Sequence, residues 1–156
     1  MRALVQRVTH AEVRIMDGTS GTFDIQPLRS IGQGFVVLLG VGVGDTETDA
    51  EKLWRKIARM RIFADENGKT NLSLKDVQGQ VMVVSQFTLY ADCRKGNRPS
   101  FKQAGDPDRA KRLYRYFTEL ACSEVPKVAA GEFGADMHVE LENDGPFTIW
   151  LDTDEW

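Results

Sequence analysis

The sequence predicts an α+β fold, built from a mostly antiparallel sheet or open β-barrel and two amphipathic helices. Segments with a strand pattern outnumber helical ones, and the two helical segments lie far apart in the chain. No strand is followed by the glycine fingerprint of a parallel nucleotide-binding sheet. Because 156 residues suffice to bury a sizeable core, we expect one domain spanning residues 1–156.

Four segments carry the strand signal. Residues 2–15 alternate with a period of two and are apolar on much of both faces, which predicts one long strand. Residues 35–41 and 81–84 are short β-favouring apolar runs, as expected of buried strands. Two alternating runs within residues 133–151 flank Gly145-Pro146, and this arrangement predicts a hairpin-like pair of strands around a Gly-Pro turn.

Two segments carry the helical signal. Capping residues precede an amphipathic pattern that predicts a helix from about Thr48 to Arg61. Asp106-Pro107 supplies an N-cap and a first-turn proline for a second helix. The apolar stripe of this helix, expected to face the core, consists of Ala110, Leu113, Tyr114, Phe117, Leu120 and Ala121. Residues 16–33, rich in Gly, Ser, Thr and Asp, predict a turn followed by a loose connection.

Composition narrows the protein class. The chain is 42% hydrophobic and 28% charged, which is ordinary for a globular protein. It has no apolar run of membrane-spanning length and no signal-peptide pattern, so we expect a cytoplasmic protein.

The few cysteines and histidines lack the spacing of metal ligands. Cys93, Cys122, His10 and His138 form neither a Cys-x-x-Cys nor a His-Glu-x-x-His pattern, so we expect no metal site and no cofactor. Cys93 follows the central motif closely enough to be considered as a thiol nucleophile. A free cysteine without a catalytic role is the favoured interpretation.

Charge is distributed unevenly along the chain. Residues 94–115 contain eight basic and two acidic side chains, a local charge of +6 in a chain of net charge −3. Such a cationic surface could neutralise phosphates of a nucleic acid. The alternative is that these side chains are the solvated positions of a loop and a helix.

The central stretch, Val81–Asp92, is the strongest candidate site from the residues alone. Its apolar first half predicts a buried strand, and hydroxyl and amide side chains follow where that strand would reach the surface. Ser85, Gln86 and Thr88 could either build a site there or satisfy neighbouring backbone groups.

Two motifs resemble those of the D-aminoacyl-tRNA deacylases. The Ser-Gln-x-Thr-Leu motif of that family is present as Ser85–Leu89, and its Asn-x-Gly-Pro-x-Thr motif is present as Asn143–Thr148. The opening Met1–Val8, the central Tyr90-Ala-Asp and Arg98–Phe101, and the late Phe133–Met137 are also similar to the family. Three features depart from the family pattern: the longer loop at 16–33, Glu132, and the acidic tail at residues 152–156.

The resemblance implies a homodimer that hydrolyses the ester of D-aminoacyl-tRNA at sites on the subunit interface. In the family, the Gly145-Pro146 bond is cis, and the turn reaches into the partner's site, where it excludes L-amino acids and admits D-residues or glycine. The resemblance further implies that Arg7 braces this turn; from the residues alone, a surface ion pair is the alternative. Phe133 is a candidate to stack on the terminal adenine, or alternatively a core phenylalanine.

The chemistry implied is electrostatic, since no Ser-His-Asp arrangement accompanies Ser85. We expect main-chain N–H groups around Phe87 and Thr88 to stabilise the oxyanion, each worth about 3–4 kcal/mol in other enzymes. The resemblance implies that the side chains of Ser85, Gln86 and Thr88 shape the pocket while the terminal ribose hydroxyl assists water. Two alternatives stay open: Thr88 as a covalent nucleophile, and a binding module that uses the 94–115 cluster without catalysis.

Overall fold

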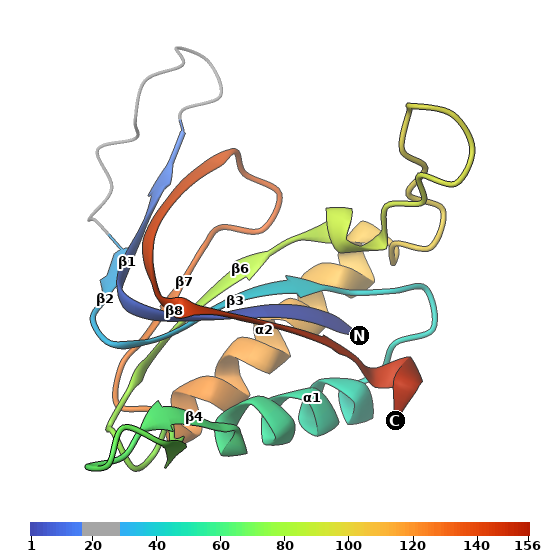
Figure 1. Ribbon diagram of the computed structural model, residues 1–156. Coiled ribbons are helices and arrows are strands. Elements are labelled where there is room, and N and C mark those ends of the chain that lie inside the picture. The colour runs from blue at the N-terminus through green and yellow to red at the C-terminus, as the bar shows by residue number, and fades with distance from the viewer. Residues whose placement is uncertain (17–28) are drawn as a thin grey trace.

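The computed structural model describes residues 1–16 and 29–156, which form a curled sheet with two helices on one face (Figure 1). In chain order the elements are β1 (Arg2–Ile15), β2 (Arg29–Ile31), β3 (Gly34–Gly40), α1 (Glu47–Arg59), β4 (Arg61–Ala64), β5 (Thr70–Ser73), β6 (Gln80–Ser85), the 3-10 turn η1 (Phe87–Tyr90), α2 (Pro107–Glu124), β7 (Val128–Ala130), β8 (Met137–Asp152) and the 3-10 turn η2 (Thr153–Glu155). The predicted α+β class with two helices is confirmed.

The main sheet has the strand order β2-β1-β3-β6-β7, and β8 also pairs with β1. The three partners of β1 are antiparallel to it, whereas β3, β6 and β7 run parallel to one another. The Arg29 guanidinium on β2 donates to the carbonyl of Ala130 on β7 (2.9 Å), so the two edges of the sheet approach each other. The sheet is therefore nearly closed, as an open barrel requires.

Two apolar clusters lie on opposite faces of this sheet. The larger cluster packs α1 and α2 against the sheet, with Trp54 meeting Phe117 edge to face at 5.7 Å. The smaller cluster, centred on Val36, Met82 and Val84, fills the curl on the other face. Because both faces of β3 and β6 are covered, their near-continuous apolar sequences are explained.

Both helices begin where capping chemistry predicts. Thr46 and Asp49 form a capping box ahead of α1. The Asp106 side chain accepts from the Asp108 and Arg109 amides (3.1 and 3.3 Å) ahead of α2. The first helix ends two residues earlier than predicted, because Met60 is extended and Arg61 already begins β4.

The hairpin predicted for residues 133–151 is wrong. Met137–Asn143 and Thr148–Asp152 do not pair with each other; both pair with β1, one half after the other, as a single strand. The Gly-Pro segment is an interruption of that pairing, and the register shifts opposite it, between Gln6 and His10. A 14-residue β1 is long enough to pair with both halves in turn.

The predicted loop at 16–33 is corrected at its end, since Arg29–Ile31 forms β2 on the edge of the sheet. The rest of that prediction, residues 17–28, lies outside the described residues.

Candidate functional site

The Ser85–Leu89 motif lies at the end of β6, where the strand turns into η1. Ser85 is the last paired residue, opposite Leu39 of β3, and the Gln86 amide still donates to the Leu39 carbonyl (2.7 Å). The turn's hydrogen bonds then run from the Leu89 amide to Gln86 (3.3 Å) and from the Ala91 amide to Thr88 (3.0 Å). The N–H groups of Phe87 and Thr88 begin the turn and are not used by these bonds.

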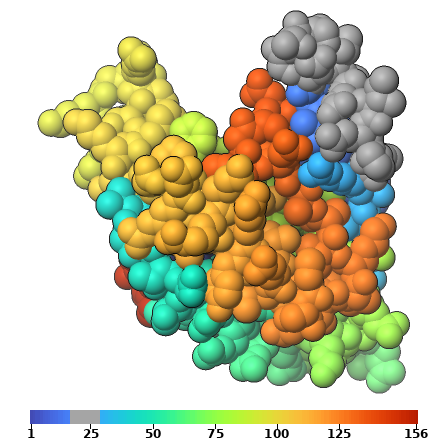
Figure 2. All heavy atoms as spheres, turned by 180° about the vertical axis from the view of Figure 1, so that it is seen from behind, coloured from blue at the N-terminus to red at the C-terminus, as the bar shows by residue number. Residues whose placement is uncertain are grey.

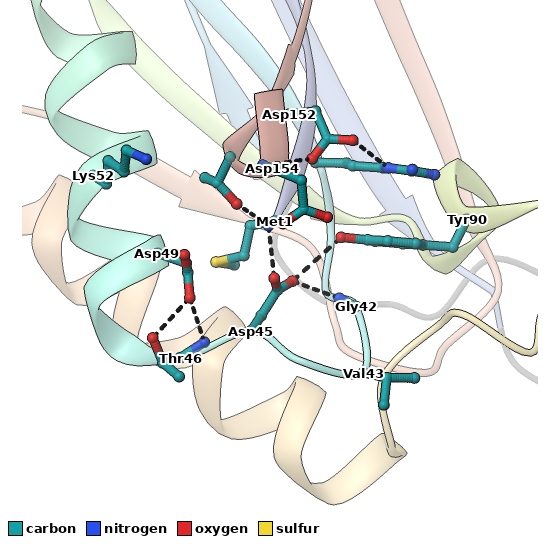
Figure 3. Close-up of polar contacts among 12 residues, drawn as sticks. Met1, Gly42, Val43, Asp45, Thr46, Asp49, Lys52, Tyr90, Asp152 and Asp154 are labelled. Atoms are coloured by element: carbon teal, nitrogen blue, oxygen red, sulfur yellow. Dashed lines mark hydrogen bonds and ion pairs between the residues drawn. The ribbon is translucent and has the colours of Figure 1, made fainter. Parts of the chain in front are cut away.

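A buried polar network holds η1 through the side chain of Tyr90 (Figure 3). The Tyr90 hydroxyl donates to Asp45 Oδ2 (3.3 Å), and Asp45 also accepts from the Gly42 amide (2.5 Å) and from the Met1 amino group (2.7 Å). Burial, with the charge of Asp45 next, raises the pKa of Tyr90, so this hydroxyl stays protonated and donates. A Cβ on Gly42 would lie 2.6 Å from the Tyr90 hydroxyl, so only glycine fits there.

Arg2 attaches the same turn to the sheet. Its guanidinium donates to the Leu89 carbonyl (3.0 Å) and to Asp152 (2.8 Å), and it lies 4.3 Å from the centroid of the Tyr90 ring. The turn that carries the motif is therefore held by β1 and by the end of β8 as well as by β6.

A cavity of about 570 Å³ opens beside the end of β6. Ser85, Gln86 and Phe87 line one side of it, and Phe133 and Met137 line another. The remaining lining residues come from β3 and the residue after it, from β6, from the segment before α2, from α2 itself, and from β8 and the segment before it: Leu39, Val41, Val84, Ala104, Gly105, Pro107, Ala110, Tyr114, Gly134, Ala135, Asp136 and Val139. Figure 2 shows the surface hollowed between the yellow segment before α2 and the red-orange segment after β7. The size fits a small-molecule or nucleoside site.

Phe133 lies on the cavity wall and packs against Tyr114, with 5.9 Å between ring centroids. The Tyr114 hydroxyl donates to the carbonyls of Val83 (2.9 Å) and Gly131 (3.1 Å), and burial raises the pKa of Tyr114 to about 12. Tyr114 thus ties β6 to the segment that carries Phe133, a role that its position in the apolar stripe of a helix did not reveal.

The Gly-Pro turn is closed by the side chain of Asn143. Asn143 Oδ1 accepts from the Phe147 amide (2.6 Å), and its Nδ2 donates to the Phe147 carbonyl and to Thr148 Oγ1 (both 3.2 Å). The Gly145-Pro146 bond is cis, and Gly145 has a φ of +149°. A Cβ on Gly145 would lie 2.7 Å from the Phe147 nitrogen, so the turn itself requires glycine.

Arg7 contacts this turn. Its Nε donates to the Asp144 carbonyl (2.9 Å) and pairs with the Asp144 carboxylate (3.1 Å), and its guanidinium lies 4.8 Å from the centroid of the Phe147 ring. It also donates to the carbonyl of Ile62 on β4. The contacts are those expected of a residue that braces the turn.

The two motifs do not meet within one chain. Gly145 and Pro146 are exposed, and none of residues 143–148 lines the cavity beside Ser85. Thr88, also exposed, accepts a hydrogen bond from the Gln86 side chain and is not a lining residue.

The alternative nucleophile and bases lie elsewhere. Cys93 is a free, exposed cysteine, and neither it nor His10 nor His138 lines the cavity. Within residues 1–16 and 29–156, no three His, Cys, Asp or Glu side chains gather as they would around a metal ion. The same residues contain no helix long and apolar enough to span a membrane.

The sequence matches a family model described as D-Tyr-tRNA(Tyr) deacylase over residues 4–152. It is 54% identical over 155 residues to a D-aminoacyl-tRNA deacylase of Lacticaseibacillus casei, covering 99% of each chain. It is 52% identical over 153 residues to a D-aminoacyl-tRNA deacylase of Thermotoga petrophila, covering 98% of this chain and 97% of the relative.

Solved structures share the fold. A chain described as c-Myc DNA Unwinding Element Binding Protein superimposes with a TM-score of 0.86 at 40% identity, covering 98% of this chain and 99% of that one. A probable eukaryotic D-amino acid tRNA deacylase superimposes with a TM-score of 0.79 over 96% and 97% of the two chains. Its 17% identity supports similarity of fold alone.

Proposed function

Because the chain belongs to the D-Tyr-tRNA(Tyr) deacylase family, we propose that it hydrolyses the ester bond of D-aminoacyl-tRNA, releasing the free D-amino acid and tRNA. The observation that carries this proposal is the cavity at the end of β6, which is lined by Ser85, Gln86 and Phe87 of the family motif and by Phe133. A proofreading enzyme of this kind would act in the cytoplasm, where charged tRNA is used.

In the proposed reaction, water adds to the ester carbonyl, the bond to the ribose oxygen breaks, and that oxygen leaves with a proton. The N–H groups of Phe87 and Thr88 would stabilise the negative charge on the carbonyl oxygen, since the turn's own hydrogen bonds leave them unused. Aminoacyl esters are intrinsically reactive, so the proposed reaction relies on these donors and does not call for a histidine relay. The ribose hydroxyl of the terminal adenosine would assist the water.

The adenosine end of the substrate would occupy the part of the cavity beside Phe133. An adenine ring can stack on an aromatic side chain, and Phe133 is held in place there by Tyr114. Ser85 and Gln86 would shape the opposite wall.

Chiral selection would come from Gly145-Pro146 of the second subunit of a homodimer. The turn is exposed and held rigidly by Asn143 and Arg7, as a probe of another subunit's site must be. Its carbonyls would leave no room for an L-side chain while admitting a D-residue, or glycine, which has no side chain.

The test is deacylation of D-Tyr-tRNA beside L-Tyr-tRNA by the purified protein, with and without a metal chelator. We expect rapid loss of the D-ester alone, unaffected by the chelator. Loss of neither ester, together with salt-sensitive tRNA binding, would contradict the proposal and support a binding module that uses the 94–115 cluster. Equal loss of both esters would contradict the chiral filter.

A further inference from the structure

Two aromatic rings are exposed side by side at the edge of the cavity. Phe87 is 58% exposed and Phe101 is 37% exposed, and their ring centroids are 4.9 Å apart at an angle of 65°. Phe87 lines the cavity and Phe101 does not, so the pair continues the aromatic surface outward from the site. Exposed aromatic rings beside a site are surfaces on which nucleic-acid bases stack.

The backbone around Phe101 is fixed by hydrogen bonds within residues 92–105 and by one to the residue after β3. Asp92 and Ser100 bond to each other in both directions (2.7 and 2.9 Å), which closes the segment between them. The Ala104 amide then donates to the Phe101 carbonyl (3.0 Å), and the Gly105 amide donates to Val41 on the sheet side (2.8 Å). The backbone that carries the Phe101 ring is therefore held in a defined position.

The segment that carries Phe101 also carries several cations. Arg94 is paired with Asp92 (2.7 and 2.9 Å), and its hydrogen bonds hold the pKa of that carboxyl well below the ordinary value. Lys95, Arg98 and Lys102 are exposed, and none of the carboxylates in the described part of the chain pairs with them. Figure 2 shows the yellow segment before α2, which includes these residues, projecting beside the hollow. Unpaired cations beside exposed rings are the combination that binds single-stranded nucleic acid.

We propose that residues 92–105 bind the unpaired nucleotides that precede the terminal adenosine of tRNA, with Phe101 stacking on one of their bases. This inference rests on the proposed function, which places the terminal adenosine in the cavity. Lys95, Arg98 and Lys102 neutralise the phosphates of those nucleotides. The turn of the second subunit is proposed to act at the cavity itself, and Phe101 does not line that cavity, so its ring is available to the nucleotides that precede the terminal adenosine.

The decisive experiment compares two substrates, D-Tyr-tRNA and the minimal ester D-tyrosyl-adenosine, which lacks the preceding nucleotides. We expect Phe101→Ala to lower kcat/KM for D-Tyr-tRNA about 5- to 150-fold, the span that one stacked base is worth. Hydrolysis of D-tyrosyl-adenosine is expected to change less than about two-fold, because Phe101 lies outside the cavity. Phe101→Trp retains a stacking surface and should stay near wild type on both substrates.

Trp156 offers a matched control. It is 40% exposed, with Lys52 and Lys56 at 5.0 and 5.5 Å from its ring, and it does not line the cavity. Trp156→Ala should leave both reactions unchanged. If Phe101→Ala slowed both esters equally, Phe101 would merely support Phe87 and the proposal would fail. If Phe101→Ala changed the sedimentation of the protein but not its kinetics, the ring would be a subunit contact, and the proposal would also fail.

Binding of a labelled single-stranded RNA ending in C-C-A tests the proposal independently of turnover. Each of Lys95→Ala, Arg98→Ala and Lys102→Ala should reduce the slope of log K against log salt by about 0.7, the value of one phosphate contact on a single strand. Lys75→Ala, which removes an exposed cation from the segment after β5, should leave the slope unchanged. If the wild-type protein hydrolyses neither ester, the proposed function fails, and the binding measurement still decides whether residues 92–105 bind RNA. Equal slopes for the wild-type protein and all variants would refute RNA binding by this segment.

Discussion

The surroundings of Thr88 decide which of two mechanisms this residue could serve. Its Oγ1 accepts a hydrogen bond from the Gln86 side-chain amide, which leaves the hydroxyl a structural partner of Gln86. Activation as a nucleophile requires a base within hydrogen-bond reach. His10 and His138 are exposed and do not line the cavity, and no carboxylate bonds to Thr88 within the described residues. The described residues thus offer Thr88 no base, and we propose that its hydroxyl orients Gln86, which lines the cavity.

At this single-residue scale we predict that Thr88→Ala keeps most of its deacylation activity, losing less than about ten-fold in kcat with D-Tyr-tRNA. Removal of a true covalent nucleophile costs on the order of 10⁴-fold or more. Single-turnover deacylation measures the difference directly. Thr88→Ser is the control, because it retains a hydroxyl: a variant series in which only Ser retains activity would restore the covalent mechanism.

At the scale of elements, Asn143 makes the interruption in β8 a defined turn. Its side chain supplies three hydrogen bonds across residues 144–146, and one of them satisfies the amide of Phe147. Strand pairing with β1 resumes at Thr148. The turn can therefore protrude without disturbing the pairing on either side.

We predict that Asn143→Ala lowers the free energy of unfolding by about 1–3 kcal/mol, because the partly buried amide of Phe147 loses its acceptor. Hydrogen exchange at the Phe147 amide should accelerate, while exchange in the paired half around Ile149 stays slow. Asn143→Asp keeps the acceptor and loses the two donated bonds, so it should retain protection at Phe147. Equal loss of protection in both variants would show that the acceptor is not what closes the turn.

Comparison of these elements with the sequence shows which of them local sequence patterns are sufficient to predict. Capping residues and periodicity predicted the starts of both helices and the strands at 2–15, 35–41 and 81–84, because those signals depend on neighbours in the chain. The apolar residues of the two halves of β8 pack on opposite faces of the sheet: Met137, Val139 and Leu141 in the smaller cluster, and Phe147, Ile149 and Leu151 against the larger one. The alternation in the sequence fits either a hairpin or one interrupted strand, and only the pairing of both halves with β1, distant in sequence, decides between them.

The site was predictable to a similar extent. The motif Ser85–Leu89 was found because polar residues end an apolar run, and the contacts of Arg7 with the turn were anticipated through the family resemblance. Tyr114 and Ala104 were missed as cavity residues because their positions are set by how α2 and the segment before it lie against the sheet. Asn143 was part of a recognised motif, but its role depends on a turn geometry that the sequence does not display.

At the scale of the whole molecule, the positions of the two motifs bear on whether one chain or two chains form a complete site. The cavity lies at the end of β6, and the exposed Gly145-Pro146 turn lies opposite the register shift in β1, beside Arg7. If the turn selects substrate, it must act on the cavity of another copy, because it does not line the cavity of its own chain. A twofold dimer would then carry two sites, each made from both chains.

Mixed dimers test this arrangement. Ser85→Phe would fill the cavity, and Gly145→Ala would distort the turn, because its Cβ would meet the Phe147 nitrogen at 2.7 Å; each variant alone should be nearly inactive. When the two proteins are mixed and allowed to exchange subunits, each mixed dimer has one site with both defects and one with neither. Activity on D-Tyr-tRNA should therefore recover to about a quarter of wild type at random assortment. If the turn acted within its own chain, every site would carry one defect and mixing would restore nothing, whereas a protein that sediments as a monomer would rule out a shared site altogether.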